Sequence, residues 1–84
     1  MRTRLSSSQI LELRDWLATG RAVEIRSRAG LSRSAIARDL GVADSALWRW
    51  EHGQRIPTGL YAAAYYGLLS RLAARDEEDE AVLA

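Results

Sequence analysis

Apolar residues recur at helical spacing at the start of the chain. Ile10, Leu13 and Leu17 follow a run of three serines and are separated by 3 and then 4 residues. This spacing places the three side chains on one face of a helix, and serine is a favoured residue at the N-terminal cap. We therefore predict a helix over about 8–18.

Single glycines divide most of the remaining chain into segments of helix length. A second helix is predicted over 21–29, either separate from the first or continuous with it through a bend at Gly20. Two short helices are predicted over 33–40 and 44–52. A longer helix is predicted over about 58–74, with Leu60 and Tyr61 among the residues of its inward, apolar side and Ala62 and Tyr66 on the opposite side. No stretch alternates polar and β-branched residues for long enough to form a strand. The predicted fold class is all-α, with five helices.

Residues 33–52 have the pattern of a helix-turn-helix. Ala37 is small where the two helices would cross, and Gly41 follows four residues later, where the turn between them requires a positive φ. An ordinary αα-corner of a helical domain is the alternative to this interpretation. The predicted core of the motif consists of Ile36, Ala37, Leu40, Gly41, Val42, Leu47 and Trp50.

The second helix of this motif is amphipathic. Leu47 and Trp50 fall on one side of the helix, while Ser45 and Arg49 fall on the other. A second helix with an exposed polar face is the element that enters the major groove of DNA in helix-turn-helix proteins. Phosphate contacts are expected from the flanking polar residues Arg33, His52, Gln54 and Arg55, and base contacts from Asp44, Ser45, Trp48 and Arg49.

Two of the candidate base contacts have alternative roles. Arg49 can donate two hydrogen bonds to one guanine, but it could instead pair with Asp44 or contact a phosphate. Trp48 either contacts thymine methyl groups and deoxyribose or stacks beneath Arg49, His52 or a neighbouring helix. The helix pattern alone leaves these alternatives open.

Composition narrows the class of protein. The chain has 84 residues, which is enough for one small domain, expected over 1–75. It has no cysteine and only one histidine, so we expect no disulfide, metal site or cofactor. No apolar run reaches the roughly 20 residues of a membrane helix, and no signal-peptide pattern follows Met1. A cytoplasmic protein is expected.

The formal net charge of +1 conceals an uneven distribution. All twelve basic residues are arginines, and five of the eleven acidic residues lie within 76–80, so 1–75 has 12 − 6 = +6. A basic domain indicates nucleic acid as a partner, although charge alone fits an ordinary solvated surface equally well. The segment 76–84 is expected to be a disordered tail that either solubilises the protein or competes with nucleic acid for the basic surface.

Several motifs resemble one known family. They are Ala29-Gly-Leu-Ser-Arg, Ile36-Ala37, Leu40-Gly41-Val42 and Trp50-Glu51-His52-Gly53-Gln54-Arg55-Ile56-Pro57. Together they resemble the helix-turn-helix domains of the phage repressor and Cro class, also called the xenobiotic-response-element family, over about 21–70. The resemblance implies a five-helix, lambda-repressor-like domain. The predicted helix over 8–18 lies outside that core.

The resemblance also implies an ion pair between Arg26 and Glu51. Arg26 lies on the apolar stripe of the helix over 21–29, so its charge needs either this partner or a path to solvent. Ala43 departs from the family, which usually has serine or threonine at this position. The cap of the following helix must then come from Asp44 or be lost.

We therefore expect a transcriptional regulator of repressor or Cro type that binds a specific, palindromic double-stranded DNA operator and acts by occupying it. A weak homodimer is expected, formed by the charge-poor faces of 1–18 and 58–74. No enzyme site and no small-molecule ligand are expected, since His52 has no partner in sequence that would make a nucleophile. The alternatives are an interaction adaptor or antitoxin on the same scaffold and a phage recombination directionality factor.

Overall fold

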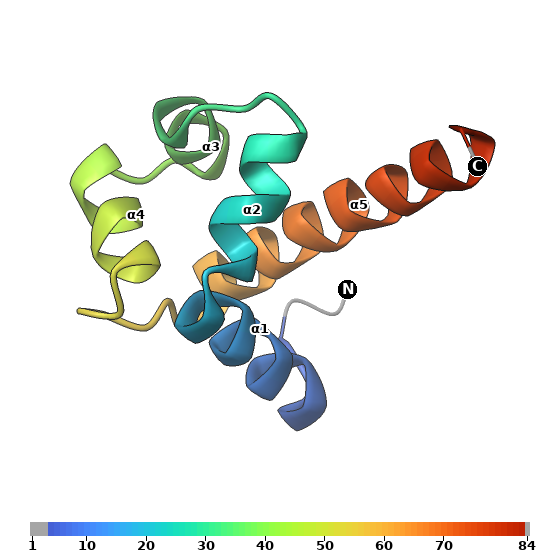
Figure 1. The fold of residues 1–84 in the computed structure, drawn as a ribbon. Coiled ribbons are helices and arrows are strands. Elements are labelled where there is room, and N and C mark those ends of the chain that lie inside the picture. Colours follow the sequence, from blue (N-terminus) through green and yellow to red (C-terminus); the bar gives the residue numbers. More distant parts are fainter. Residues whose placement is uncertain (1–3, 84) are drawn as a thin grey trace.

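Five helices follow one another along the chain (Figure 1). The computed structural model describes residues 4–83, of which 80–83 are described by their backbone alone. This range contains no strand, so the predicted all-α class is confirmed. The helices are α1 (Ser7–Thr19), α2 (Arg21–Arg28), α3 (Arg33–Leu40), α4 (Asp44–Glu51) and α5 (Gly59–Leu83).

Local sequence signals set the boundaries of the first two helices. Ser6 and Gln9 form a capping box at the start of α1, because each side chain accepts a hydrogen bond from the backbone N–H of the other, at 3.2 and 2.9 Å. Gly20 has a φ of 84°, in the left-handed region, which ends α1 and precedes α2 directly. The two helices are therefore separate and not one bent helix.

One hydrophobic core joins all five helices. In Figure 1, α5 runs behind α2 and extends past it, away from α4. The indole of Trp50 and the ring of Tyr65 lie 5.4 Å apart and connect α4 to α5. The fully or nearly buried apolar residues are Leu13, Leu17, Ala22, Ile25, Ile36, Ala37, Leu47, Trp50, Ala62, Tyr65 and Leu69.

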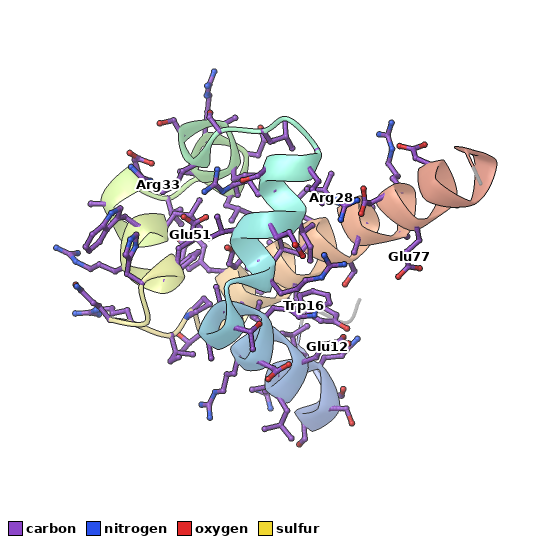
Figure 2. The ribbon with its side chains drawn as sticks, in the orientation of Figure 1. Glu12, Trp16, Arg28, Arg33, Glu51 and Glu77 are labelled. Carbon is purple, nitrogen blue, oxygen red and sulfur yellow. The ribbon has the colours of Figure 1, made fainter. Side chains whose placement is uncertain are left out.

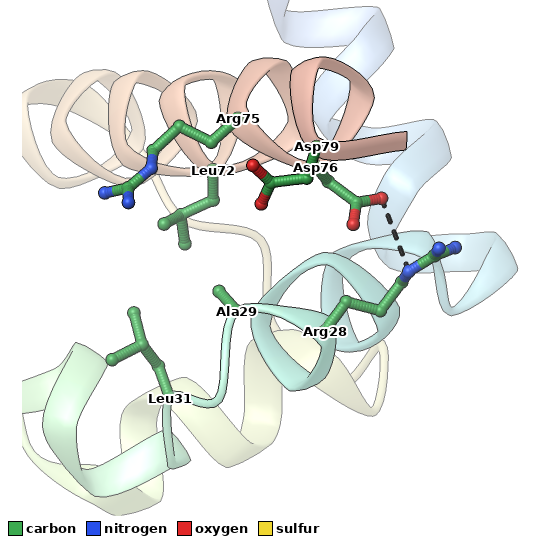
Figure 3. A pocket seen from close by; sticks show the side chains of 7 residues that line it. All are labelled: Arg28, Ala29, Leu31, Leu72, Arg75, Asp76 and Asp79. Carbon is green, nitrogen blue, oxygen red and sulfur yellow. Dashed lines mark ion pairs between the residues drawn. The ribbon is translucent and has the colours of Figure 1, made fainter. Parts of the chain in front are cut away.

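The expectation of a disordered tail over 76–84 is corrected by the structure. Instead of ending near 74, α5 continues to Leu83, and Ala84 lies outside the described residues. A tertiary contact supports the extension, because the Arg28 Nε lies 3.3 Å from the Asp76 Oδ2 across a hollow of about 260 Å³ (Figure 3). This ion pair joins α5 to the end of α2, and composition alone does not reveal it.

The buried side of α5 also differs from the predicted one. Leu60 and Tyr61, expected to face inward, are 65% and 51% exposed, whereas Ala62 is buried. Tyr66, expected on the outer side, stacks on Trp16 of α1 with ring centroids 5.4 Å apart. Small and apolar residues surround this part of the helix on all sides, so their spacing does not indicate which side faces the core.

Candidate nucleic-acid interface

The turn between α3 and α4 sets the angle of the motif. Ser32 caps α3, since its Oγ accepts a hydrogen bond from the Ala35 N–H at 3.0 Å. Gly41 then adopts a φ of 74°, and the Val42 N–H donates to the Ala37 carbonyl at 3.0 Å. A left-handed residue followed by this bond is a common helix ending, and it directs the chain into α4.

Apolar packing holds α4 against the rest of the domain. Ile36 and Leu47 are completely buried, and Ala37 and Trp50 are nearly so, while Leu40 and Val42 are half-buried at the edge of the core. The predicted core of the motif is therefore brought together in the structure. One side of α4 is fixed by these contacts, and the opposite side is left exposed.

A buried ion pair fixes the C-terminal end of α4. The Arg26 Nε and Nη2 donate to the Glu51 Oε2 and Oε1 at 2.7 and 3.1 Å, and the Nη1 donates to the Leu31 carbonyl at 3.2 Å. The two side chains are only 14% and 2% exposed. The pairing that the resemblance implies is thus present, and Arg26 does not extend to solvent. This ion pair joins α4 to α2 and to the loop that precedes α3.

The N-terminal end of α4 is held differently. Ala43 is the N-cap residue and provides no side-chain hydrogen bond, so the usual cap is lost and Asp44 does not replace it. Asp44 instead pairs with Arg33, with the Arg33 Nε 2.9 Å from Oδ1 and the Nη2 3.3 Å from Oδ2. Arg33 is labelled at the start of α3 in Figure 2. This exposed, two-bond pair links the starts of both helices of the motif.

The Arg33–Asp44 pair changes the titration of both groups. Hydrogen bonds from the Arg33 guanidinium, and its positive charge, hold the pKa of Asp44 below its ordinary value. The same bonds raise the pKa of Arg33 above its ordinary value. The carboxylate is therefore charged at neutral pH, and each group is partly neutralised by the other.

Trp48 stacks on His52 along the exposed face of α4. Their ring centroids lie 3.9 Å apart with an angle of 19° between the planes, and Trp48 is 37% exposed. The His52 Nδ1 lies 2.8 Å from the Trp48 carbonyl oxygen. Because a carbonyl only accepts, Nδ1 carries the hydrogen, and Nε2 is a bare acceptor when the ring is neutral. The predicted stacking of Trp48 on His52 is present, and contact of Trp48 with DNA stays a prediction.

The other predicted contact residues are exposed and available. Within residues 4–79, the side chains of Ser45, Arg49, Gln54 and Arg55 form no hydrogen bond or ion pair, and Arg49 does not pair with Asp44. An open hollow of about 490 Å³ lies beside α4. Arg49, Arg55, Thr58 and Tyr61 are among its lining residues.

Two features of this surface were not predicted from the sequence. The pairing of Arg33 with Asp44 was missed, although each residue was predicted to contact DNA separately. Opposite charges at the first positions of consecutive helices were the available signal. Thr58 and Tyr61 also line the hollow, and the pattern of residues at the start of the predicted helix over 58–74 does not indicate this.

The described part of the chain has neither a metal-binding cluster nor a membrane-spanning helix. Residues 4–83 contain no cluster of three histidine or acidic residues placed to hold a metal ion. None of the described helices is long and apolar enough to cross a membrane.

Comparison with known proteins identifies the motif independently. The model of the helix-turn-helix domain family matches residues 20–81, which is well over half of the chain and includes α2 to α5. The match is consistent with a domain of the xenobiotic-response-element type, and it begins after α1. No curated protein and no solved structure matches this chain.

Proposed function

The chain belongs to the helix-turn-helix domain family, whose members bind DNA, and we propose that it is a transcriptional regulator of repressor or Cro type. It binds a specific site on double-stranded DNA and acts by occupying that site, which excludes polymerase or a competing regulator. This role places the protein in the cytoplasm, on the DNA of a bacterial or phage-infected cell.

The exposed face of α4 is the observation that carries the proposal. Leu47 and Trp50 are buried on one side, and the Arg26–Glu51 pair locks the far end, so the opposite side is presented in a fixed orientation. A rigidly held helix with a polar outer face suits insertion into the major groove, because base contacts require precise placement of side chains.

The base contacts are assigned to Asp44, Ser45, Trp48 and Arg49. Arg49 has no partner in the described part of the protein, so its guanidinium is free to donate two hydrogen bonds to guanine O6 and N7. Asp44 is an acceptor that Arg33 partly neutralises, which lowers the cost of bringing a carboxylate near the phosphates. Trp48 contributes an apolar contact from its exposed edge.

The phosphate contacts are assigned to Arg33, His52, Gln54 and Arg55. Gln54 and Arg55 are exposed in the loop after α4 and need no rearrangement. Arg33 must share its guanidinium between Asp44 and a phosphate, which its several N–H donors allow. His52 donates from Nε2 only in its charged form, because Nδ1 is already bound to the Trp48 carbonyl.

A single recognition helix reads only a few base pairs, so the proposed regulator binds as a homodimer to a palindromic operator. The two half-sites then lie about one helical turn apart. The charge-poor surfaces of α1 and of the first half of α5, where Leu11 and Leu60 are 65% exposed, are the proposed interface.

The proposal is tested by selecting duplexes from a random pool with the full chain and then comparing variants on the selected site. Arg49→Ala is expected to lower the ratio of specific to non-specific affinity by about 5-fold to 150-fold, which corresponds to about 1–3 kcal/mol for a lost two-bond contact. Arg55→Ala is expected to weaken binding to all sequences alike and to reduce the slope of log K against log salt.

Arg71→Ala is the matched control, because Arg71 is exposed on α5 and lies apart from the face of α4. It should leave both quantities unchanged. An unchanged affinity ratio in Arg49→Ala would remove Arg49 from the base contacts. Duplex binding that does not depend on salt, or the absence of duplex binding, would instead favour a protein-interaction role on the same scaffold.

A further inference from the structure

A groove lies between α1 and the start of α5, and it shares Ile56, Pro57 and Thr58 with the hollow beside α4. Its volume is about 220 Å³. Because the family match begins at residue 20, the α1 side of this groove is an addition to the helix-turn-helix domain. The floor and walls are mostly apolar and include Leu5, Ile10, Leu13, Ile56, Pro57 and Ala62.

Two arginines complete the lining of the groove. Arg4 and Arg14 are both exposed, and within residues 4–79 no acidic side chain pairs with either. Ile10 and Ile56, which also line the groove, are 38% and 44% exposed. An exposed apolar surface bordered by unpaired positive charge is suited to a segment that is both acidic and apolar.

The chain contains one segment with this composition. Five acidic residues over 76–80 are followed in the sequence by Ala81-Val82-Leu83-Ala84. Asp76 is paired with Arg28, but the following residues Glu77, Glu78 and Asp79 are exposed. Their charge is opposite to that of the groove.

This segment cannot reach the groove of its own chain. Ala62 lines the groove, and Glu77 lies 15 residues further along the same continuous helix, at a distance of about 22 Å at 1.5 Å per residue. Figure 1 shows α5 ending on the far side of α2 from α4. The same geometry excludes competition between these acids and DNA for the α4 face of their own chain, but it leaves them accessible to another molecule.

We propose that the groove between α1 and α5 binds the acidic segment 76–84 of a second copy of this chain. In a two-fold dimer the exchange is reciprocal, so that each copy contributes one groove and one acidic segment. Arg4 and Arg14 pair with Glu77, Glu78 and Asp79 of the second copy. This inference rests on the proposed homodimer and specifies its interface.

The test compares the association of full-length variants by analytical ultracentrifugation. Arg14→Glu is expected to raise the dissociation constant of the dimer at least tenfold, and so is Glu77→Arg combined with Glu78→Arg, because each change creates repulsion at both contacts. A mixture of the two variants should form a heterodimer in which both contacts are attractive again, one as in the wild type and one with both charges reversed. Arg38→Glu, on α3, is the control for a change of net charge.

Circular dichroism of each variant establishes that it is folded. All samples are full-length chains. Self-association of both variants at the wild-type level would overturn the groove as the interface while leaving the homodimer in place. A mixture that associates no more tightly than either variant alone would also overturn the groove as the interface. A wild-type chain that is monomeric both free and on a selected duplex would overturn the homodimer itself.

Discussion

The two ends of α4 are each held by an arginine–carboxylate pair with two hydrogen bonds, but the surroundings of the pairs differ. At the C-terminal end, Glu51 is 2% exposed and Arg26 also bonds a backbone carbonyl. At the N-terminal end, Arg33 and Asp44 are 34% and 45% exposed, so both side chains remain in contact with solvent. The same chemistry therefore serves a structural purpose at one end and leaves an adjustable contact at the other.

Burial decides the difference because of what remains when one partner is removed. A buried carboxylate that loses its arginine cannot recover water, whereas an exposed one is solvated at once. The C-terminal end of α4 is thus anchored by a pair that cannot exchange its partner for water. At the N-terminal end, the exposed pair leaves Arg33 able to exchange Asp44 for a phosphate in the proposed complex with DNA.

Removing the buried arginine is the strongest way to test this comparison. Arg26→Ala leaves Glu51 buried without a partner and is expected to lower the free energy of unfolding by about 3–5 kcal/mol. That is a large share of the roughly 5–15 kcal/mol available to a domain. Urea unfolding at neutral pH, followed by circular dichroism, measures it.

Arg33→Ala is the matched control, because it removes an arginine from the same kind of two-bond pair in an exposed place. Its effect on unfolding should be small. Equal losses in the two variants would show that burial does not separate the roles of the two pairs.

A cap added at the exposed end sharpens the comparison. Ala43 has φ −70° and ψ 147°, close to the −74° and 159° of Ser32, whose side chain caps α3. Ala43→Ser is therefore expected to supply the missing hydrogen bond and raise the free energy of unfolding by about 1 kcal/mol. Ser32→Ala, which removes an existing cap, should lower it by a similar amount in the same urea experiment. A loss of stability in Ala43→Ser would mean that this end of α4 cannot accept a cap.

The smallest expected effect is a pH dependence from the exposed pair. The pKa of Asp44 is lower in the folded protein than in the unfolded chain. The stabilisation that ionised Asp44 provides is therefore fully present above the unfolded pKa, and it is lost as the pH falls through the folded pKa. The difference in urea midpoint between wild type and Asp44→Asn should then shrink as the pH falls from about 5 into the acidic range below about 4. In an Arg33→Ala background the difference should be smaller, because Arg33 contributes more to the lowered pKa of Asp44 than Ser34 and Arg26 do. A difference of unchanged size would assign the effect to those two neighbours.

The sequence predicts the first four helices well because their limits are local. Ser32 and Gly41 mark the beginning and end of α3 through bonds within a few residues, and Gly20 separates α1 from α2 in the same way. The burial of Leu47 and Trp50 also follows from their positions around a single helix. Such features need no knowledge of how distant segments pack.

The errors concern α5 and the pairing of charges between helices. The extension through 76–83 depends on packing against the end of α2, where Asp76 meets Arg28, and an acidic composition alone suggests disorder. The outward position of Leu60 depends on which side of an almost uniformly apolar helix meets the core. The Arg33–Asp44 pair depends on the angle between α3 and α4. All three are determined by tertiary geometry.

Gly20 has a consequence for how two copies would be spaced along DNA. It ends α1 and begins α2 without any intervening linker, so the direction of α1 relative to the helix-turn-helix depends on the two dihedral angles of one residue, φ 84° and ψ 2°. A β-carbon there would meet no atom within 4 Å, so the conformation, and not crowding, is what requires glycine. In a dimer built on α1, this single residue would set the phase between the two recognition helices, a property that other proteins adjust through linker length.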